Sequence, residues 1–450
     1  MDLSAFKAYD IRGRVPAQLN SRFAEQLGRA FVAVTGAKRV VVGYDIRLSS
    51  PELAESLRRG LTAAGADVLD IGLGGTEQVY FSAFHYDVDG GIMVTASHNP
   101  EDYNGMKLVG KGSRPISSDN GLLEIKALMT EHLPDAPESG TVRAKDCMPD
   151  FVKHLLGYVN PRELHPLTIV SNPGNGGAGL VIDALAPHLP FRFHSVHHTP
   201  DGTFPHGVPN PLLPENREST REAVIAADAD MGIAWDGDFD RCFFFDETGR
   251  FIEGYYLVGL LAEQFLAREP GAKIIHDPRL TWNTIDLVQS LGGQPVQSKT
   301  GHAFIKQTMR DEDAIYGGEM SAHHYFREFA YCDSGMIPWL MIAHLICRSG
   351  KTLSQLIDER MAKYPASGEI NRTIGDPKAL LAEIEGLYSP GALNVEHVDG
   401  LSVAFEDWRF NLRMSNTEPL VRLNVESKGD VALMQRKTEE LLLRMEAFAG

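Results

Sequence analysis

Apolar positions in this chain form short continuous runs, and each run is followed by a segment with helical periodicity. The first such unit comprises the apolar run 39–44 (RVVVGY), the amphipathic segment 50–65 and a second run at 66–72. Further copies begin at 167–170 (LTIV) and 273–276 (KIIH). A continuous apolar run, a helix and a second run are typical of the βα unit of a mostly parallel sheet. The pattern therefore predicts three topologically related α/β domains with mixed sheets.

The stretch after residue 365 has a different pattern. Segments 408–413 (WRFNLR) and 420–427 (LVRLNVES) alternate polar and apolar residues and are joined by the turn sequence MSNTEP. They predict paired strands, and the amphipathic tail 431–446 predicts a helix. We therefore expect a smaller α+β domain at the C-terminus.

Chain length also favours several domains, since single hydrophobic cores stop growing near ~250–300 residues and this chain has 450. Polar segments with proline or glycine at 134–146 and 364–368 mark two boundaries, whereas the boundary near Gly249 has a weaker signal. These boundaries predict four domains, at 1–147, 148–250, 251–365 and 366–450.

Composition narrows the range of partners. The formal net charge is −17, and no basic stripe is present, so we expect no nucleic-acid partner. No long uncharged apolar run indicates a membrane span. The four cysteines have no CxxC or CxxH spacing, which predicts buried thiols in a reducing compartment. The first residues lack a basic-then-apolar leader, so we expect a cytoplasmic protein.

Each α/β copy contains one more short apolar strand, and a polar loop follows it. GIMVT precedes ASHNP, MGIAW precedes DGDFDR, and DAIY precedes GGEMSAHH. In open α/β sheets, ligands bind beyond the carboxyl ends of the strands. We therefore expect the three loops to face a shared central cleft.

The DGDFDR loop places Asp236, Asp238 and Asp240 at alternate positions. In an extended loop, alternate side chains share a face, so the three carboxylates would converge. Two unit charges ~4 Å apart cost about 4 kcal/mol at an effective dielectric constant of ~20, and a hard divalent cation such as Mg²⁺ removes that cost. The alternative interpretation is a solvated acidic turn.

Two other motifs overlap this loop. An EF-hand is rejected, because Arg241 stands at the position that needs glycine and the flanking segments are strand-like. An apolar strand followed by DxD also resembles haloacid-dehalogenase phosphatases, in which Asp236 would be the nucleophile. Those enzymes usually have Thr or Val where this chain has Asp240, but the phosphatase stays an alternative.

A metal site gives Ser97 a possible role. A phosphate on Ser97 would supply a further oxygen ligand to the cation, and Lys107 and Arg241 could steady its equatorial oxygens. The alternative is that Ser97-His98-Asn99-Pro100 is only a turn, since Asn-Pro is favourable turn chemistry.

The remaining loops carry groups suited to a sugar phosphate. Glu319 and Ser321 can bind adjacent sugar hydroxyls, and His323 can transfer a proton near neutral pH. Two guanidinium forks and a turn rich in hydroxyl and amide donors suit a phosphate dianion: Arg413, Ser415, Asn416, Thr417 and Arg422. Without the other motifs, both loops would be interpreted as ordinary turns.

One glycine-rich motif is interpreted as structural. Gly174, Gly176 and Gly179 fit GxGxxG after a strand, the dinucleotide-binding fingerprint. The acidic residue expected at the end of the next strand is missing, because FRFHSVHH ends in histidines. The motif therefore predicts a tight turn between strand and helix.

The four loops, in this order, resemble the α-D-phosphohexomutases, and most closely their bacterial phosphomannomutase/phosphoglucomutase branch. TASHNP, DGDFDR, GEMSAH and RMSNTEP match the phosphoserine, metal, sugar and phosphate loops of that family, and KAYDIRG and GYDIRLSSP match as well. The resemblance covers the whole chain. It implies reversible interconversion of hexose 6-phosphate and hexose 1-phosphate through a phosphoserine and a bisphosphorylated sugar.

The resemblance also implies roles for individual residues. The residues implied to be catalytic are Ser97, His98, Lys107, Arg12, Arg241 and His323. The residues implied to bind substrate are Tyr9, Arg279, His302, Glu319, Ser321, Arg413, Ser415, Asn416, Thr417 and Arg422. The metal ligands implied are Ser97, Asp236, Asp238 and Asp240. Relatives commonly have lysine at the position of Arg279. The resemblance does not decide whether Arg12, Lys107 or His323 transfers the proton in each direction.

The implied cofactors are Mg²⁺ and a hexose 1,6-bisphosphate, which acts as intermediate and activator. The implied substrates are mannose and glucose 1- and 6-phosphates, and we expect a monomer or weak homo-oligomer. Turning the sugar by half a revolution roughly exchanges O3 and O4, so Glu319 and Ser321 could hold both orientations without contacting the C2 hydroxyl. We expect both epimers to be accepted, with mannose favoured. A non-catalytic sugar-phosphate sensor is a further alternative.

Overall fold

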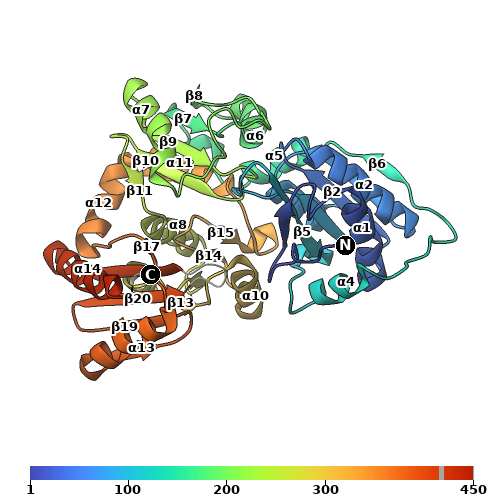
Figure 1. Ribbon diagram of the computed structural model, residues 1–450. Coiled ribbons are helices and arrows are strands. Elements are labelled where there is room, and N and C mark those ends of the chain that lie inside the picture. The colour runs from blue at the N-terminus through green and yellow to red at the C-terminus, as the bar shows by residue number, and fades with distance from the viewer. Residues whose placement is uncertain (415–419, 449–450) are drawn as a thin grey trace. The chain divides into compact units, whose positions relative to one another are not determined.

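The computed structural model describes residues 1–414 and 420–448 and divides into two compact units (Figure 1). Unit 1 comprises Met1–Phe251 and His323–Gly350, and unit 2 comprises Ile252–Ala322 and Lys351–Gly450. Each unit is described by itself.

The first sheet of unit 1 has the strand order β1-β5-β4-β2-β3-β6. Its strands are β1 (Ile11–Arg14), β2 (Arg39–Tyr44), β3 (Asp67–Leu73), β4 (Gly90–Val94), β5 (Tyr103–Gly110) and β6 (Val142–Ala144). The helices of this part are α1 (Ser21–Thr35), α2 (Ser50–Ala63), α3 (Thr76–His85) and α4 (Leu122–Leu128). β2 is parallel to β3 and β4, whereas β5 is antiparallel to both β4 and β1. The sheet is therefore mixed, as the apolar pattern predicts.

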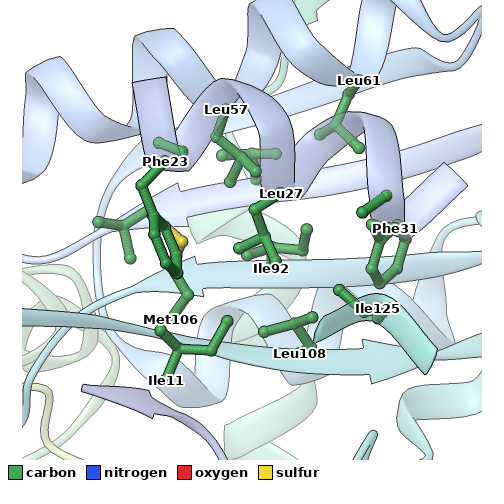
Figure 2. Packing of buried hydrophobic residues seen from close by; sticks show 14 of the residues in the cluster. Ile11, Phe23, Leu27, Phe31, Leu57, Leu61, Ile92, Met106, Leu108 and Ile125 are labelled. Atoms are coloured by element: carbon green, nitrogen blue, oxygen red, sulfur yellow. The ribbon is translucent and has the colours of Figure 1, made fainter. Parts of the chain in front are cut away.

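Figure 2 shows the core between this sheet and its helices. Phe23, Leu27 and Phe31 of α1 are fully buried against Ile92 of β4 and Leu108 of β5. Asn20 caps α1, because its side-chain oxygen accepts a hydrogen bond from the backbone N–H of Phe23. The apolar face of α1 and the buried strands thus form one continuous core.

Helices α1 and α2 approach closely because glycines lie at their contact. A Cβ on Gly60 would lie 1.9 Å from the backbone oxygen of Glu25, and one on Gly28 would lie 2.6 Å from that of Leu57. Real side-chain atoms do not approach backbone oxygens so closely. The spacing of the two helices over the first sheet therefore depends on these two residues.

The second sheet of unit 1 has the order β11-β10-β9-β7-β8. Its strands are β7 (Thr168–Asn172), β8 (Arg192–Ser195), β9 (Met231–Trp235), β10 (Cys242–Asp246) and β11 (Phe251–Ile252), although Ile252 itself belongs to unit 2. The helices are α5 (Met148–Leu156), α6 (Ala178–Leu185) and α7 (Glu218–Ala226). Unit 1 also contains the antiparallel pair β15 (His324–Phe326) and β16 (Cys332–Asp333), followed by α11 (Ile337–Ser349).

Unit 2 contains a parallel group of strands and an antiparallel sheet. The parallel strands are β12 (Lys273–His276), β13 (Gln294–Gln297) and β14 (Tyr316–Gly318). The antiparallel strands, in the order β17-β21-β20-β19-β18, are β17 (Ile370–Thr373), β18 (Asn394–Glu396), β19 (Leu401–Ala404), β20 (Trp408–Met414) and β21 (Leu420–Ser427). The helices are α8 (Gly254–Arg268), α9 (Trp282–Ser290), α10 (His302–Glu312), α12 (Leu353–Lys363), α13 (Pro377–Tyr388) and α14 (Val431–Glu446). Short 3₁₀ turns lie at Lys111–Ser113, Pro161–Glu163, Ala186–His188, Pro214–Asn216, Arg327–Phe329 and Ser389–Gly391.

The predicted repeat is confirmed by strand order. β4-β2-β3, β9-β7-β8 and β14-β12-β13 are parallel groups with the same sequence of neighbours. The C-terminal antiparallel sheet with its helices is the predicted α+β part. Two strand predictions need correction: the strand expected across FRFHSVHH ends at Ser195, and the one expected at DAIY begins at Tyr316. The described helices include none long and apolar enough to cross a membrane.

Replacing Gly60 by alanine tests the close helix contact. We expect G60A to lower the free energy of unfolding by about 2 kcal/mol, because the 1.9 Å clash places overpacking at the upper end of its ~1–3 kcal/mol range and the helix-propensity gain offsets only ~1 kcal/mol. Urea unfolding followed by circular dichroism measures the change. The matched control is G386A, since a Cβ on this exposed residue of α13 meets no atom within 4 Å. Equal stability of G60A and G386A would contradict the explanation.

Candidate active site

Ser97 lies directly after β4 in a strained turn. Its backbone φ is 49°, in the left-handed region, which costs a residue other than glycine about 1–3 kcal/mol. The side-chain oxygen of Thr95 accepts a hydrogen bond from the Ser97 N–H at 2.9 Å. The turn ends the strand and leaves the Ser97 hydroxyl at the carboxyl edge of the sheet.

Arg47 holds this turn from inside the protein, a role that the motif analysis missed. Its Nη2 donates to the carbonyl oxygens of Ser97 at 2.9 Å and Asn99 at 2.6 Å. Its Nη1 donates to the carbonyl oxygens of Pro100 at 2.7 Å and Tyr103 at 2.9 Å. Arg47 is only 2% exposed, so this guanidinium substitutes for the backbone partners that a regular strand would provide. Its only sequence signal was its place in the GYDIRLSSP match.

The three aspartates meet in a turn between β9 and β10. Asp236, Asp238 and Asp240 each offer a carboxylate oxygen within 4.8 Å of the others, and all three are at most 2% exposed. The expected extended loop is wrong: the Phe239 N–H donates to the Asp236 carbonyl oxygen at 3.1 Å, and Phe239 has a φ of 47°. The carboxylates therefore converge around a tight turn, and the interpretation as a solvated acidic turn does not fit their burial.

Ser97 lies against this acidic turn. Its Oγ donates to Oδ2 of Asp236 at 2.9 Å. A Cβ on Gly237 would lie 2.8 Å from the Ser97 carbonyl oxygen, and one on Gly176 would lie 2.9 Å from the Gly237 carbonyl oxygen. Gly176 of the GxGxxG segment thus makes room for the acidic turn, which explains this glycine without a nucleotide.

Two cations face the three carboxylates. Lys107 Nζ lies 2.8 Å from Oδ2 of Asp238 and 2.6 Å from Oδ2 of Asp240. Arg241 donates from Nε to Oδ2 of Asp236 at 2.9 Å. Three buried acids paired with two buried bases leave the cluster negatively charged.

Burial and the neighbouring charges shift the pKa values of Asp238 and Asp240 in opposite directions. Burial favours the neutral form of Asp238, but Lys107 and Thr76 outweigh it and hold the pKa of Asp238 well below its usual range. Burial and then the charge of Asp238 raise the pKa of Asp240 to about 6. Burial alone would lower the pKa of Lys107, yet Asp238 and Asp240 raise it above its ordinary value. Lys107 is therefore a permanent cation that pairs with both Asp238 and Asp240.

The acidic turn fits a hard divalent cation. Oδ1 of Asp238 and Oδ1 of Asp240 are buried and have no hydrogen-bond partner among residues 1–414 and 420–448. Leaving such oxygens unpaired is costly, whereas an all-oxygen donor set is what Mg²⁺ prefers. The donors, their burial and their uncompensated charge all suit this ion.

His98 and Arg12 flank Ser97. The His98 Nδ1 lies 3.1 Å from Ser97 Oγ and 2.7 Å from Arg241 Nη2. A guanidinium only donates, so His98 Nδ1 accepts and the ring is neutral. Burial, followed by the charges of Arg241 and Arg12, lowers the pKa of His98 well below its usual value. Arg12, on β1, contacts the same turn through Asn99 and the Ala96 carbonyl oxygen.

The acidic turn has a neighbouring histidine. The His323 Nδ1 lies 2.9 Å from Oδ2 of Asp333, which is 1% exposed. His323, Asp333 and Asp240 each offer a ligand atom within 4.8 Å of the others. Asp333 was not singled out in the sequence. It fixes the orientation of an imidazole whose side chain is still 20% exposed.

Thr76 is a second residue that the sequence did not reveal. Its Oγ1 donates to Oδ2 of Asp238 at 2.6 Å, and its backbone N–H donates to the Asp238 carbonyl oxygen at 3.2 Å. Thr76 begins α3, next to Gly75, whose Cβ would lie 2.2 Å from the Phe239 ring. The start of α3 therefore holds the acidic turn in place.

In unit 2, a part of the predicted substrate-binding set lies together. Arg279 Nη2 donates to Ser321 Oγ at 3.2 Å and lies 3.7 Å from Oε1 of Glu319. Glu319 Oε1 also accepts from the Gly301 N–H at 2.9 Å, directly before His302 at the start of α10. Arg279, Glu319 and Ser321 thus form one polar cluster.

The other predicted substrate residues are placed as follows. Arg413 and Arg422 are opposite each other in the β20–β21 register and belong to unit 2. Ser415, Asn416 and Thr417 lie outside the described residues. Tyr9 is partly buried just before β1 in unit 1.

A strained serine, a buried carboxylate triad and paired cations on α/β sheets are typical of metal-dependent phosphoryl-transfer enzymes. Models of the phosphoglucomutase/phosphomannomutase family match four parts of the chain. The α/β/α domains I, II and III match residues 3–134, 149–249 and 253–364, and the C-terminal domain matches residues 369–443.

Full-length relatives agree with these matches. The chain is 58% identical to a phosphomannomutase of Escherichia coli strain K12 over 448 residues, which covers 98% of both chains. It is also 58% identical to a protein named phosphohexose mutases of Xanthomonas campestris, covering 98% of this chain and 99% of the relative. A phosphoglucomutase/phosphomannomutase family protein of Burkholderia thailandensis superposes with a TM-score of 0.89 at 33% identity, covering 100% of this chain and 99% of the other. The chain therefore belongs to the phosphoglucomutase/phosphomannomutase family.

Replacing Thr76 by valine tests how the acidic turn is held. We expect T76V to weaken Mg²⁺ binding about tenfold, because losing the hydroxyl donor lets the Asp238 carboxylate rotate. Isothermal titration of Mg²⁺ measures the change, with T373V on the exposed face of β17 as the matched control. Unchanged Mg²⁺ affinity in T76V would mean that Asp238 is positioned without this hydrogen bond.

Proposed function

We propose that this protein is a phosphomannomutase that also accepts glucose phosphates and interconverts hexose 6-phosphates and hexose 1-phosphates. The observation that carries the proposal is the Ser97 hydroxyl, 2.9 Å from Asp236 in a buried carboxylate triad. Its full-length similarity to phosphomannomutases supports the same activity.

Ser97 is proposed to carry the phosphoryl group. In the first half-reaction the bond between the phosphorus and the Ser97 Oγ breaks as a bond to the free sugar hydroxyl oxygen forms. In the return half-reaction the bond between the other phosphorus of the bisphosphorylated sugar and its sugar oxygen breaks as a bond to the Ser97 Oγ forms. Arg47 and Thr95 hold the Ser97 turn throughout, so the oxygen stays at one place. Lys107 and Arg241 offset the charge on the transferred group.

The triad is proposed to hold Mg²⁺, with Asp236, Asp238, Asp240 and the phosphate on Ser97 as ligands. When bound, Mg²⁺ would withdraw charge from the phosphoryl oxygens. The chain's own contribution is a dry and fixed set of oxygen donors, positioned by Thr76 and Lys107.

The sugar hydroxyl must lose a proton as it attacks. His323 is a candidate base because Asp333 contacts its Nδ1 and so fixes the orientation of the imidazole. Arg12 and Lys107 remain candidates for charge stabilisation. His98 is assigned a positioning role, because its Nδ1 accepts from Arg241 beside Ser97.

In unit 2, Glu319 and Ser321 are proposed to hold O3 and O4 of the sugar, with Arg279 and His302 beside them. Arg413 and Arg422, with Ser415, Asn416 and Thr417, are proposed to bind the phosphate that is not being transferred. Tyr9 is proposed as a further substrate contact. A hexose 1,6-bisphosphate is the proposed intermediate and activator.

Further expectations stay proposals. The domains are proposed to divide at 147/148, 250/251 and 365/366. The protein is proposed to be a cytoplasmic monomer or weak homo-oligomer with no nucleic-acid or membrane partner.

The phosphatase alternative loses support, because the family models that match the whole chain are those of mutases. A non-catalytic sensor has no specific observation in its favour.

Replacing Ser97 by alanine tests the proposed nucleophile. We expect S97A to lower mutase kcat by about 10³-fold or more, because no other residue takes over the phosphoryl group. Phosphopeptide analysis of the wild type should find phosphate on Ser97 that resists hydroxylamine. S195A, at the exposed end of β8, is the matched control and should stay active. Wild-type turnover in S97A, or a hydroxylamine-labile phosphate on Asp236, would contradict the proposal.

A coupled assay tests the sugar specificity. With mannose 1-phosphate and glucose 1-phosphate as alternative substrates, we expect both to turn over and kcat/KM to be higher for mannose 1-phosphate. Both should turn over because Glu319 and Ser321 are proposed to bind O3 and O4 but not the C2 hydroxyl, the only difference between these sugars. The expected preference for mannose 1-phosphate rests on the full-length similarity to phosphomannomutases. Strict rejection of glucose 1-phosphate would require a contact to the C2 hydroxyl that the proposal lacks.

A further inference from the structure

A single carboxylate lies among three arginines in unit 2. Glu369, immediately before β17, has Oε2 at 3.2 Å from Arg279 Nη1 and 4.0 Å from Arg413 Nη2. Its Oε1 lies 3.7 Å from Arg422 Nη1. Arg413 and Arg422 are the guanidinium groups proposed to bind phosphate, so Glu369 occupies the neighbourhood of that anion.

The three guanidinium groups need an anion. Burial, and next the charge of Arg279, lower the pKa of Arg413, which reports the repulsion within the cluster. Asp277 pairs with Arg279 at 2.8 Å and Asp399 lies 3.6 Å from Arg413, but each serves one arginine. Glu369 is the carboxylate that all three arginines share among the residues described.

Glu369 satisfies the cluster incompletely. The Nε atoms of Arg279, Arg413 and Arg422 are buried and have no hydrogen-bond partner in the described part of the chain. Only one of the three Glu369 contacts, the one to Arg279, is a hydrogen bond; the other two are longer ion pairs. A phosphate monoester offers three terminal oxygens and a charge of about −1.5 to −2, so it can satisfy more of these donors than a carboxylate.

We propose that Glu369 is an internal counter-ion that stands in for the substrate's phosphate in the free protein and is displaced when that phosphate binds. This inference rests on the proposed function of Arg413 and Arg422. The Glu369 side chain is 22% exposed, so it has a path to turn toward solvent. Its presence keeps the arginines assembled and makes a monoanion a poor competitor, since only a dianion gains more from the cluster than Glu369 does. Glu369 therefore sets both the affinity and the charge selectivity of the site.

The test is E369Q, which keeps the shape of the side chain and removes its charge. Isothermal titration with inorganic phosphate in Mg²⁺-free buffer should show about three- to tenfold tighter binding than wild type, and KM for mannose 1-phosphate should fall by a similar factor. E385Q is the matched control. Glu385 of α13 pairs with His397, and the Glu385 side chain is 42% exposed. Its phosphate affinity should equal that of the wild type.

Arg422 provides an internal check on where the phosphate binds. The gain in affinity from E369Q should disappear in the double variant E369Q/R422A. E369D, whose shorter side chain withdraws the carboxylate from the arginines, should shift affinity in the same direction as E369Q and guards against poor folding of either variant. Weaker or unchanged phosphate binding in E369Q and E369D would overturn the proposal and assign Glu369 to bracing the arginines.

The two proposals fail in different ways. If wild-type protein interconverts no hexose phosphates, the proposed function is wrong, yet the phosphate titration still reports on Glu369. If mutase activity is normal but E369Q binds phosphate no more tightly, only the counter-ion proposal is wrong.

Discussion

Three buried carboxylates within 4.8 Å of one another must be neutralised, and the structure of unit 1 is organised around that requirement. Two cations face the acidic turn: Lys107 on β5 and Arg241, which lies immediately before β10. The remaining negative charge and the unpaired Oδ1 atoms of Asp238 and Asp240 define a place for a divalent cation. The strained Ser97 turn lies beside that place because Gly237 has no side chain to keep it away.

The arginine cluster of unit 2 also needs neutralisation, but here the clustered charges are positive. Three neighbouring and partly desolvated guanidinium groups repel one another unless an anion lies among them, and Glu369 supplies one. In both clusters the protein's own partners satisfy the charges only in part. An incompletely satisfied buried charge is costly for stability, but it gives binding energy to a ligand that completes the set. Under the proposed function, these incompletely satisfied charges favour binding of a cation in unit 1 and of a phosphate in unit 2.

The sequence predicted the architecture well, because buried parallel strands appear as continuous apolar runs whatever their tertiary context. RVVVGY, LTIV and KIIH correspond to the strands β2, β7 and β12, and the neighbours of these three strands recur in the same order. The acidic turn was harder, since its shape depends on Phe239 packing against Gly75, far away in sequence. Arg47, Thr76 and Glu369 were missed for the same reason: each is ordinary in its local sequence and acts through partners distant along the chain.

The cation proposed at the carboxylate triad would directly contact the phosphate on Ser97. Electron–nuclear double resonance on the Mn²⁺-loaded phosphoprotein measures this contact through the hyperfine coupling between manganese and phosphorus. The account predicts a strong phosphorus coupling typical of direct coordination, absent in dephosphorylated protein and in S97A. Manganese bound to the phosphoprotein without any such coupling would contradict it.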